Sequence, residues 1–374
     1  MTNLLAPLRH EKHSDTIDLR VGQDVDIADS VGIVDGDVAL ERRVVLGRGP
    51  IGDISVADSG TDTVVAANVA DQNLSIIGCG ARPTGDDFDV VGEIGLSGEP
   101  VAVVAGADRA YVVTGSIGQD TLSVIDLGTR SIAATFPLAF AATAMTVSRD
   151  GKRVFLGRTA RDRVGITVID TAAESMSEVE IGYGPAASVD ALCVDPNGTR
   201  LYAAVTDVGG SRLVIIDPEN PGVQRVVVVG SPIRDIAHAG DTIYVLTSDR
   251  AVGGAVHVVD LSTRRVTDTV ITGGAPTQLV MSPDHARAYI VDYDRVAVLC
   301  TLNLEVVDAL SFQARPSCVA LGPDGTHLYV ADYSGVMHQF SVESTIEMQY
   351  SHFLATDPVA LSVPRARELQ PARI

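Results

Sequence analysis

The stretch Gly274–Leu310 reads GAPTQLVMSPDHARAYIVDYDRVAVLCTLNLEVVDAL, and the fold can be worked out from it. It holds four short apolar runs, Gln278–Met281, Ala288–Val291, Val296–Cys300 and Glu305–Leu310. Turn residues separate the runs: Pro283-Asp284, Asp292-Tyr293-Asp294 and Asn303. Short runs rich in β-branched residues, placed between turn residues, predict an antiparallel meander of four strands.

The same unit recurs along nearly the whole chain. Units start at Pro50, Pro100, Ala142, Pro185, Pro232, Gly274 and Pro316. The steps between prolines 50 and 316 average about 44 residues, the length of a four-stranded blade with short turns. Radial repetition of such blades predicts an all-β fold, a single β-propeller.

The two ends of the chain decide the number of blades. Val21–Ile27, Val31–Val34 and Val38–Leu46 resemble the second, third and fourth strands of a blade, and Asp357–Val363 resembles a lone first strand. Pairing the two ends closes the ring and removes exposed strand edges. We therefore expect eight blades, the last shared between the termini. The alternative is seven blades, in which only Val38–Leu46 closes the ring as an outer strand and Asp357–Val363 is a tail.

These boundaries divide the chain into a polar N-terminal tail at residues 1–20, a propeller at 21–363 and a C-terminal tail at 364–374. The formal net charge of −20 argues against binding nucleic acid or an anionic membrane surface. Four cysteines without paired spacing indicate reduced thiols. The first twenty residues contain no apolar leader, and no run reaches membrane-spanning length. We expect an acidic, soluble, cytoplasmic monomer.

Several segments resemble a known repeat. LYVAD at 328–332, TIYVLT at 242–247, LSVID at 122–126 and ITVID at 166–170 resemble the YVTN-type β-propeller repeat. That family is related to surface-layer and cytochrome-domain propellers and to propeller lactonases. The resemblance covers about Val21 to Val363, and it implies the propeller architecture without implying one activity. No lactonase-specific motif accompanies it, and the absence of Trp excludes a WD40 repeat.

The loops on one face of the propeller are uneven. Antiparallel order places the turns between second and third strands on the face where successive blades are joined. Four of these turns, after Val113, Leu156, Val205 and Leu246, are long and polar, whereas the last two shrink to DYD and DYS. A raised rim on one side of the channel mouth is expected, and binding residues favour such loops. Tolerated drift in loop length is the alternative.

Three acids interrupt the first strands. The position five residues before the turn is apolar in most blades, as at Val103, Met145, Leu279 and Val319, but it is Asp53, Asp190 and Asp235 in the other three. An acid in an apolar position is costly unless it is paired. One interpretation is a carboxylate cluster at the channel mouth that holds a divalent cation, a polyol or a cationic ligand. The other is that each Asp accepts hydrogen bonds from amides of the next blade.

Two further sets of residues are candidates for binding. Arg234 and His238 flank Asp235 and are expected to line the channel or to pair with an acid of the next blade. Arg158, Arg161 and Arg163 form the one local concentration of positive charge and are candidates for contact with an anionic partner. A solvated loop and a buried structural histidine are the simpler interpretations.

The sequence predicts a non-catalytic binding or scaffold propeller whose loop-rich face engages a protein partner or a small ligand. No nucleophile elbow, zinc-type spacing, phosphate loop or dinucleotide fingerprint is present. The alternative is a hydrolase or lactonase-like enzyme with a divalent cation at the channel mouth. No cofactor is expected for the binding protein, and Ca²⁺ or Mg²⁺ are the candidate cations for the enzyme.

Overall fold

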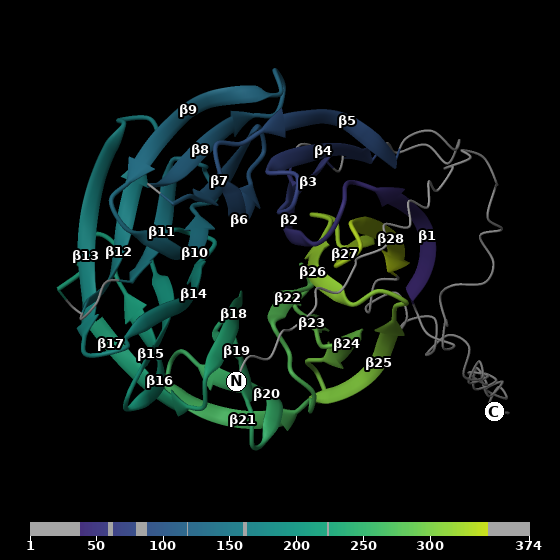
Figure 1. The fold of residues 1–374 in the computed structure, drawn as a ribbon. Helices are drawn as coiled ribbons and strands as arrows, with labels where there is room; N and C mark the ends of the chain where they lie inside the picture. The colour runs from purple at the N-terminus through teal and green to yellow at the C-terminus, as the bar shows by residue number, and fades with distance from the viewer. Residues whose placement is uncertain are drawn as a thin grey trace, which may run out of the picture. The chain divides into compact units, whose positions relative to one another are not determined.

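The structure is a computed structural model that describes residues 38–58, 63–79, 88–117, 119–159, 163–222 and 224–342. All of these residues belong to the compact unit Val31–Ile374. They form twenty-eight β-strands arranged in seven four-stranded antiparallel sheets. The predicted propeller of four-stranded blades is therefore confirmed (Figure 1).

The first four blades each follow the chain from their inner strand outward. Blade 1 holds β2 (Ile51–Ala57), β3 (Thr63–Asn68), β4 (Asn73–Cys79) and β5 (Phe88–Gly95). Blade 2 holds β6 (Glu99–Ala105), β7 (Arg109–Gly115), β8 (Asp120–Asp126) and β9 (Ser131–Leu138). Blade 3 holds β10 (Ala141–Val147), β11 (Arg153–Thr159), β12 (Arg163–Asp170) and β13 (Ser175–Tyr183). Blade 4 holds β14 (Ser188–Val194), β15 (Leu201–Asp207), β16 (Gly210–Ile216) and β17 (Gln224–Gly230).

The last three blades complete the ring. Blade 5 holds β18 (Ile233–Ala239), β19 (Thr242–Asp249), β20 (Gly253–Asp260) and β21 (Arg265–Ile271). Blade 6 holds β22 (Gln278–Met281), β23 (Arg287–Val291), β24 (Arg295–Cys300) and β25 (Glu305–Ser311). Blade 7 holds β26 (Pro316–Leu321), β27 (His327–Asp332), β28 (Val336–Val342) and, as its outer strand, β1 (Val38–Val45). The first strand of each blade contacts the first strands of both neighbours, including β26 with β2.

The apolar core is divided among the blade interfaces. Seven clusters of buried side chains fill the seven interfaces, one cluster to each pair of neighbouring blades. The second strands contribute an aromatic residue to six of them: Tyr111, Phe155, Tyr202, Tyr244, Tyr289 and Tyr329. Blade 1 has Val65 at this position. The tyrosine of the LYVAD-type segment thus packs against the following blade, and burial of its ring stabilises each junction.

The expectation of eight blades is wrong, because the ring closes with seven. β1 pairs antiparallel with β28, from Val38 opposite Val342 to Val45 opposite Val336. The N-terminal side therefore supplies one outer strand to blade 7, and no shared eighth blade is needed for closure. The physical reason is that Leu46 and Ile51 pack with Tyr329 and Met337 in the cluster between blades 7 and 1. The segments Val21–Ile27, Val31–Val34 and Asp357–Val363, on which the count of eight relied, lie outside the described residues.

Candidate functional site

An axial cavity of about 470 Å³ lies between the innermost strands and is lined by residues of all seven blades. Four of the five residues predicted for the channel mouth line it: Asp53, Asp190, Arg234 and Asp235. The first strands of blades 1, 4 and 5 carry these side chains inward. Residues that are distant in the sequence thus face one shared space.

Asp53 and Asp235 make the same contacts in two different blades. The Oδ2 atom of Asp53 accepts a hydrogen bond from the backbone amide of Val103 at 2.9 Å, and its Oδ1 accepts one from Ile54 at 3.0 Å. The Oδ2 of Asp235 accepts from Leu279 and its Oδ1 from Ile236, both at 2.8 Å. Each carboxylate joins its own blade to the next one, as expected for a pairing between blades.

Gln278 shows that this connection does not need a charge. It lies in β22 at the position equivalent to Asp235, and its Oε1 accepts a hydrogen bond from the amide of Val319 at 2.7 Å. Blades 1 and 2, 5 and 6, and 6 and 7 are therefore joined by one kind of contact. A neutral amide oxygen in the same role favours the structural interpretation of the two acids.

The surroundings of Asp53 and Asp235 in the channel shift the pKa values of both carboxyl groups strongly. Burial raises the pKa of Asp53 from 3.8 to about 7, although amides of Val103 and Ile54 oppose the shift and the charge of Asp235 adds to it. Burial likewise raises the pKa of Asp235 to about 6 against the hydrogen bonds from Leu279 and Ile236. Desolvation outweighs amide donation in both cases. The charge of Asp235 thus acts on the carboxyl of Asp53.

Asp190 does not share their position. The register of β14 with β15 shifts between Val189 and Ala191, so Asp190 is the extra residue of a β-bulge. In β18 the equivalent residue is Arg234, because the shift there falls between Ile233 and Asp235. The Oδ1 of Asp190 accepts a hydrogen bond from the Ser188 hydroxyl at 2.6 Å, and its Oδ2 accepts one from the Thr206 hydroxyl. The prediction that all three acids are equivalent is wrong for this residue.

Arg234 and His238 separate in the structure. Arg234 is exposed and lines the cavity. The ring of His238 lies 5.7 Å from that of Tyr202 in blade 4, and burial lowers its pKa. His238 is thus a packed residue of the interface between blades 4 and 5, whereas Arg234 carries the positive charge toward the channel.

In blade 3, Arg158 of β11 and Arg163 of β12 form ion pairs with acids of their own blade. Arg158 lies 2.8 Å from Glu178 and 5.9 Å from the centroid of Phe140, and Arg163 lies 3.3 Å from Glu180. Arg161 lies outside the described residues. The glutamates of β13 reduce the positive charge that Arg158 and Arg163 offer to an anionic partner.

The residues that the structure describes give little evidence for a metal site or for a reactive cysteine nucleophile. No three His, Cys, Asp or Glu side chains among residues 38–342, as far as the structure describes them, converge as metal ligands. Cys79, Cys193, Cys300 and Cys318 form no disulfide, and burial raises the pKa of the Cys193 thiol to about 12. A thiol in such surroundings is a poor nucleophile.

The face that carries the second-to-third turns, called here the hairpin face, differs from the expectation of long loops. The extra residues of blades 3 to 5 extend the paired strands instead, since Thr159 pairs with Val164, Asp207 with Gly210 and Asp249 with Gly253. In blade 6 the last pair is Val291 with Val296, before the turn Asp292–Asp294. The blades therefore differ mainly in how far their second and third strands stay paired, and less in the length of the turn between them.

A stack of Tyr293, Arg315 and Tyr333 lies on this face between blades 6 and 7. The guanidinium of Arg315 is 3.9 Å from the ring centroid of Tyr293 and 5.1 Å from that of Tyr333. Its Nε donates to the Tyr293 carbonyl at 3.2 Å. The tyrosines are 57% and 49% exposed. Both tyrosines belong to the short turns DYD and DYS, whereas the binding loops expected from the sequence are the longer turns of other blades.

Comparison with known proteins agrees with this architecture. The chain is 31% identical over 341 residues to the seven-bladed beta-propeller protein Rv1057 of Mycobacterium tuberculosis, covering 81% of this chain and 85% of the relative. It is 45% identical over 339 residues to a seven-bladed beta-propeller protein of Mycolicibacterium smegmatis, covering 89% and 90%. A solved structure of Kuenenia stuttgartiensis hydrazine synthase matches with a TM-score of 0.66 at 19% identity, covering 84% of this chain and all of that one. This last likeness concerns the fold alone.

The fold and these relatives define the class as a β-propeller protein. More narrowly, the chain belongs to the family of seven-bladed β-propeller proteins represented by the two mycobacterial relatives. No family model matches the chain, so the resemblance to the YVTN repeat stays a prediction. The described part of the chain holds no helix long and apolar enough to cross a membrane.

Proposed function

We propose that this chain is a non-catalytic binding propeller whose hairpin face engages a protein partner. The observation that carries the proposal is the exposed stack of Tyr293, Arg315 and Tyr333. Tyrosine and arginine are enriched among the residues that dominate binding at protein interfaces. Here both aromatic rings are held by the cation, so little conformational entropy is lost when a partner covers them.

Other side chains on the same face support a broad contact. Hairpin ends of three blades expose an apolar side chain: Ile117, Val208 and Val252. Tyr183, at the end of β13, is exposed on the same face. These residues come from blades 2 to 5, whereas the stack comes from blades 6 and 7. Features spread over most of a face suit a polypeptide surface better than a small ligand, which needs a concave pocket.

The channel supports the hydrolase alternative less well. Both oxygens of Asp53 and both oxygens of Asp235 already accept backbone amides. A divalent cation would have to compete with these donors for the carboxylates. The four cysteines, none of which forms a disulfide, also support the proposal of a cytoplasmic location.

The test compares the partners retained by purified wild-type protein and by a Tyr293→Ala/Tyr333→Ala variant. Leu302→Ala is the control, because Leu302 is also exposed but lies in the turn between β24 and β25, away from the hairpin face. We expect one partner to bind wild-type protein and L302A alike and to bind the double variant at least tenfold more weakly in a titration with both proteins purified. Equal affinity for all three proteins would contradict the assignment of this face.

A further inference from the structure

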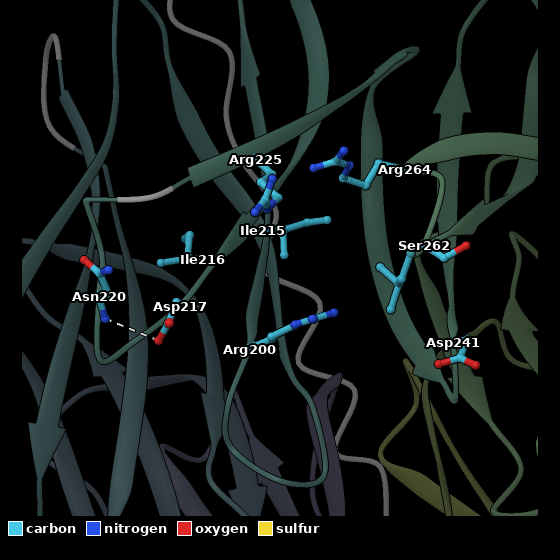
Figure 2. Close-up of a pocket in the computed structure, with 10 residues that line it drawn as sticks. Arg200, Ile215, Ile216, Asp217, Asn220, Arg225, Asp241, Ser262 and Arg264 are labelled. Carbon is cyan, nitrogen blue, oxygen red and sulfur yellow. Dashed lines mark hydrogen bonds between the residues drawn. The ribbon is translucent and has the colours of Figure 1, made fainter.

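A second cavity, of about 650 Å³, opens between blades 4 and 5 on the face opposite the hairpin face. It is lined by the turns that follow first strands and third strands (Figure 2). Three arginines contribute to its wall: Arg200 before β15, Arg225 in β17 and Arg264 in the turn before β21. Three guanidinium groups at one cavity stand out on a chain whose formal net charge is −20.

Two of these arginines, Arg225 and Arg264, have no ion-pair partner in the part of the chain that the structure describes. Among the residues that the structure describes, neither side chain takes part in a hydrogen bond or an ion pair. Both are exposed and both line the cavity, and Figure 2 shows the side chain of Arg264 extending toward Arg225. Unpaired guanidinium groups that face one space repel each other, and an anion placed between them relieves that repulsion.

Two of the three nearby acids, Glu219 and Asp217, are engaged by an ion pair or by backbone amides. Glu219 belongs to the same β16–β17 loop as the cavity wall, but its carboxylate lies 2.6 Å from Arg153 of blade 3. The Oδ1 of Asp217 accepts hydrogen bonds from the amides of Glu219 at 2.9 Å and Asn220 at 3.2 Å, the latter drawn in Figure 2. Asp241 lines the cavity apart from Arg225 and Arg264 (Figure 2).

A fourth acid, Asp260, stabilises the turn that presents Arg264. The Oδ1 of Asp260 accepts hydrogen bonds from the Ser262 hydroxyl at 2.7 Å and from the Thr263 amide at 2.6 Å. These bonds lower the pKa of Asp260 to about 2, so it stays ionised and committed to the turn. The turn is thereby fixed, and Arg264 has a positive φ of 57° within it. The guanidinium group of Arg264 is thus presented by a turn that the hydrogen bonds to Asp260 stabilise.

We propose that this cavity is a binding site for a small molecule that carries a multiply charged oxyanion, a phosphate or polycarboxylate group. Guanidinium groups bind such anions through paired N–H donors, and the two unpaired arginines supply these donors. Arg200 adds a third positive charge from the neighbouring turn, and the volume accommodates a metabolite-sized ligand. The site is independent of the hairpin face and of the partner proposed for it.

The experiment is a calorimetric titration of the full chain with pyrophosphate and, in a second arm, with citrate. Sodium chloride keeps the ionic strength constant, since exposed charges are screened by salt. The variant is Arg225→Ala/Arg264→Ala, in which both changes are at exposed positions. The control is Arg265→Ala, which removes the same charge from the next residue without touching the cavity wall.

We expect saturable binding to wild-type protein and to R265A, weakened at least tenfold in the double variant. Preference for pyrophosphate would assign a phosphate ligand, and preference for citrate a polycarboxylate. Either result supports the site provided that the double variant loses it. Absence of saturable binding by both probes at millimolar concentration, or equal binding by the double variant and R265A, would overturn the proposal.

Discussion

The Oδ2 atom of Asp53 in blade 1 lies 2.9 Å from the amide nitrogen of Val103 in blade 2, and it accepts that donor across the blade interface. Asp235 repeats the contact with Leu279 between blades 5 and 6. The position is the same in both inner strands, one residue after the β-bulge. Of the two interpretations that the sequence allows for these acids, the hydrogen bond to an amide of the next blade is the one found at both Asp53 and Asp235.

Replacing Asp53 by alanine should destabilise the protein by about 1–3 kcal/mol, because the amides of Val103 and Ile54 lose their acceptor. Asp235→Ala should cost a similar amount for the same reason. Chemical denaturation measures both. Asn at either position keeps one carbonyl oxygen, as Gln278 does naturally, and should lose less. A gain in stability from either alanine would contradict the structural role.

The same residues predict an unusual dependence of stability on pH. A carboxyl whose folded-state pKa is raised binds its proton more tightly in the native state, so its contribution is lost as pH rises through that value. The pKa of Asp53 is about 7 and that of Asp235 about 6, against 3.8 when unfolded. The free energy of unfolding should thus fall between about pH 4 and 7, by an amount on the order of a few kcal/mol.

The lowered pKa values of His238 and His257 change the free energy of unfolding in the opposite direction over part of this pH range. Burial lowers the pKa of both, so their contributions to stability grow as pH rises toward 6.5. The informative quantity is therefore the difference between wild-type protein and Asp53→Asn, measured by denaturation from about pH 4.5 to 7.5. That difference should change steadily with pH. A constant difference would mean that Asp53 does not titrate in this range.

The sequence located Asp53 and Asp235 in the innermost strands but could not separate Asp190 from them. Counting back from the turn places all three at one position. A β-bulge inserts one residue, and its place along a strand depends on pairing that the sequence pattern does not reveal. In β14 the bulge falls on Asp190, so its carboxylate contacts two hydroxyls of blade 4 instead of an amide of blade 5.

The number of blades was missed for a related reason. The repeat identified the blade, its four strands and the start of each unit, because hydrophobic alternation and turn residues are local signals. Closure is not local: it depends on which terminal strand reaches the open edge of β28. Val38–Val45 occupies that edge. The strand-like sequences of Val21–Ile27, Val31–Val34 and Asp357–Val363 suggested a further blade.

Closure of the ring by β1 predicts different effects on stability for two adjacent residues, Leu46 and Val45. Leu46 is 5% exposed and packs between blades 7 and 1, whereas Val45 is 70% exposed. Leu46→Ala should destabilise the protein by about 2–5 kcal/mol through lost burial and a residual cavity. Val45→Ala should change stability by less than about 0.5 kcal/mol. Denaturation of the two variants provides the comparison, and equal effects would mean that the end of β1 does not seal the ring.

The final prediction separates the binding protein from the hydrolase. Thermal melts with and without millimolar Ca²⁺ or Mg²⁺ should coincide, because the oxygens of Asp53 and Asp235 already accept amides. A cation at a thousandfold excess over its Kd would stabilise the folded state by about 4 kcal/mol, so a real site would be visible. Asp53→Asn/Asp235→Asn serves as the matched variant. If wild-type protein gains stability with either cation and this variant does not, the channel binds a cation, and the hydrolase becomes the better-supported hypothesis. Stabilisation that persists in the variant would instead place the cation elsewhere on this acidic chain and leave the structural role of the two carboxylates intact.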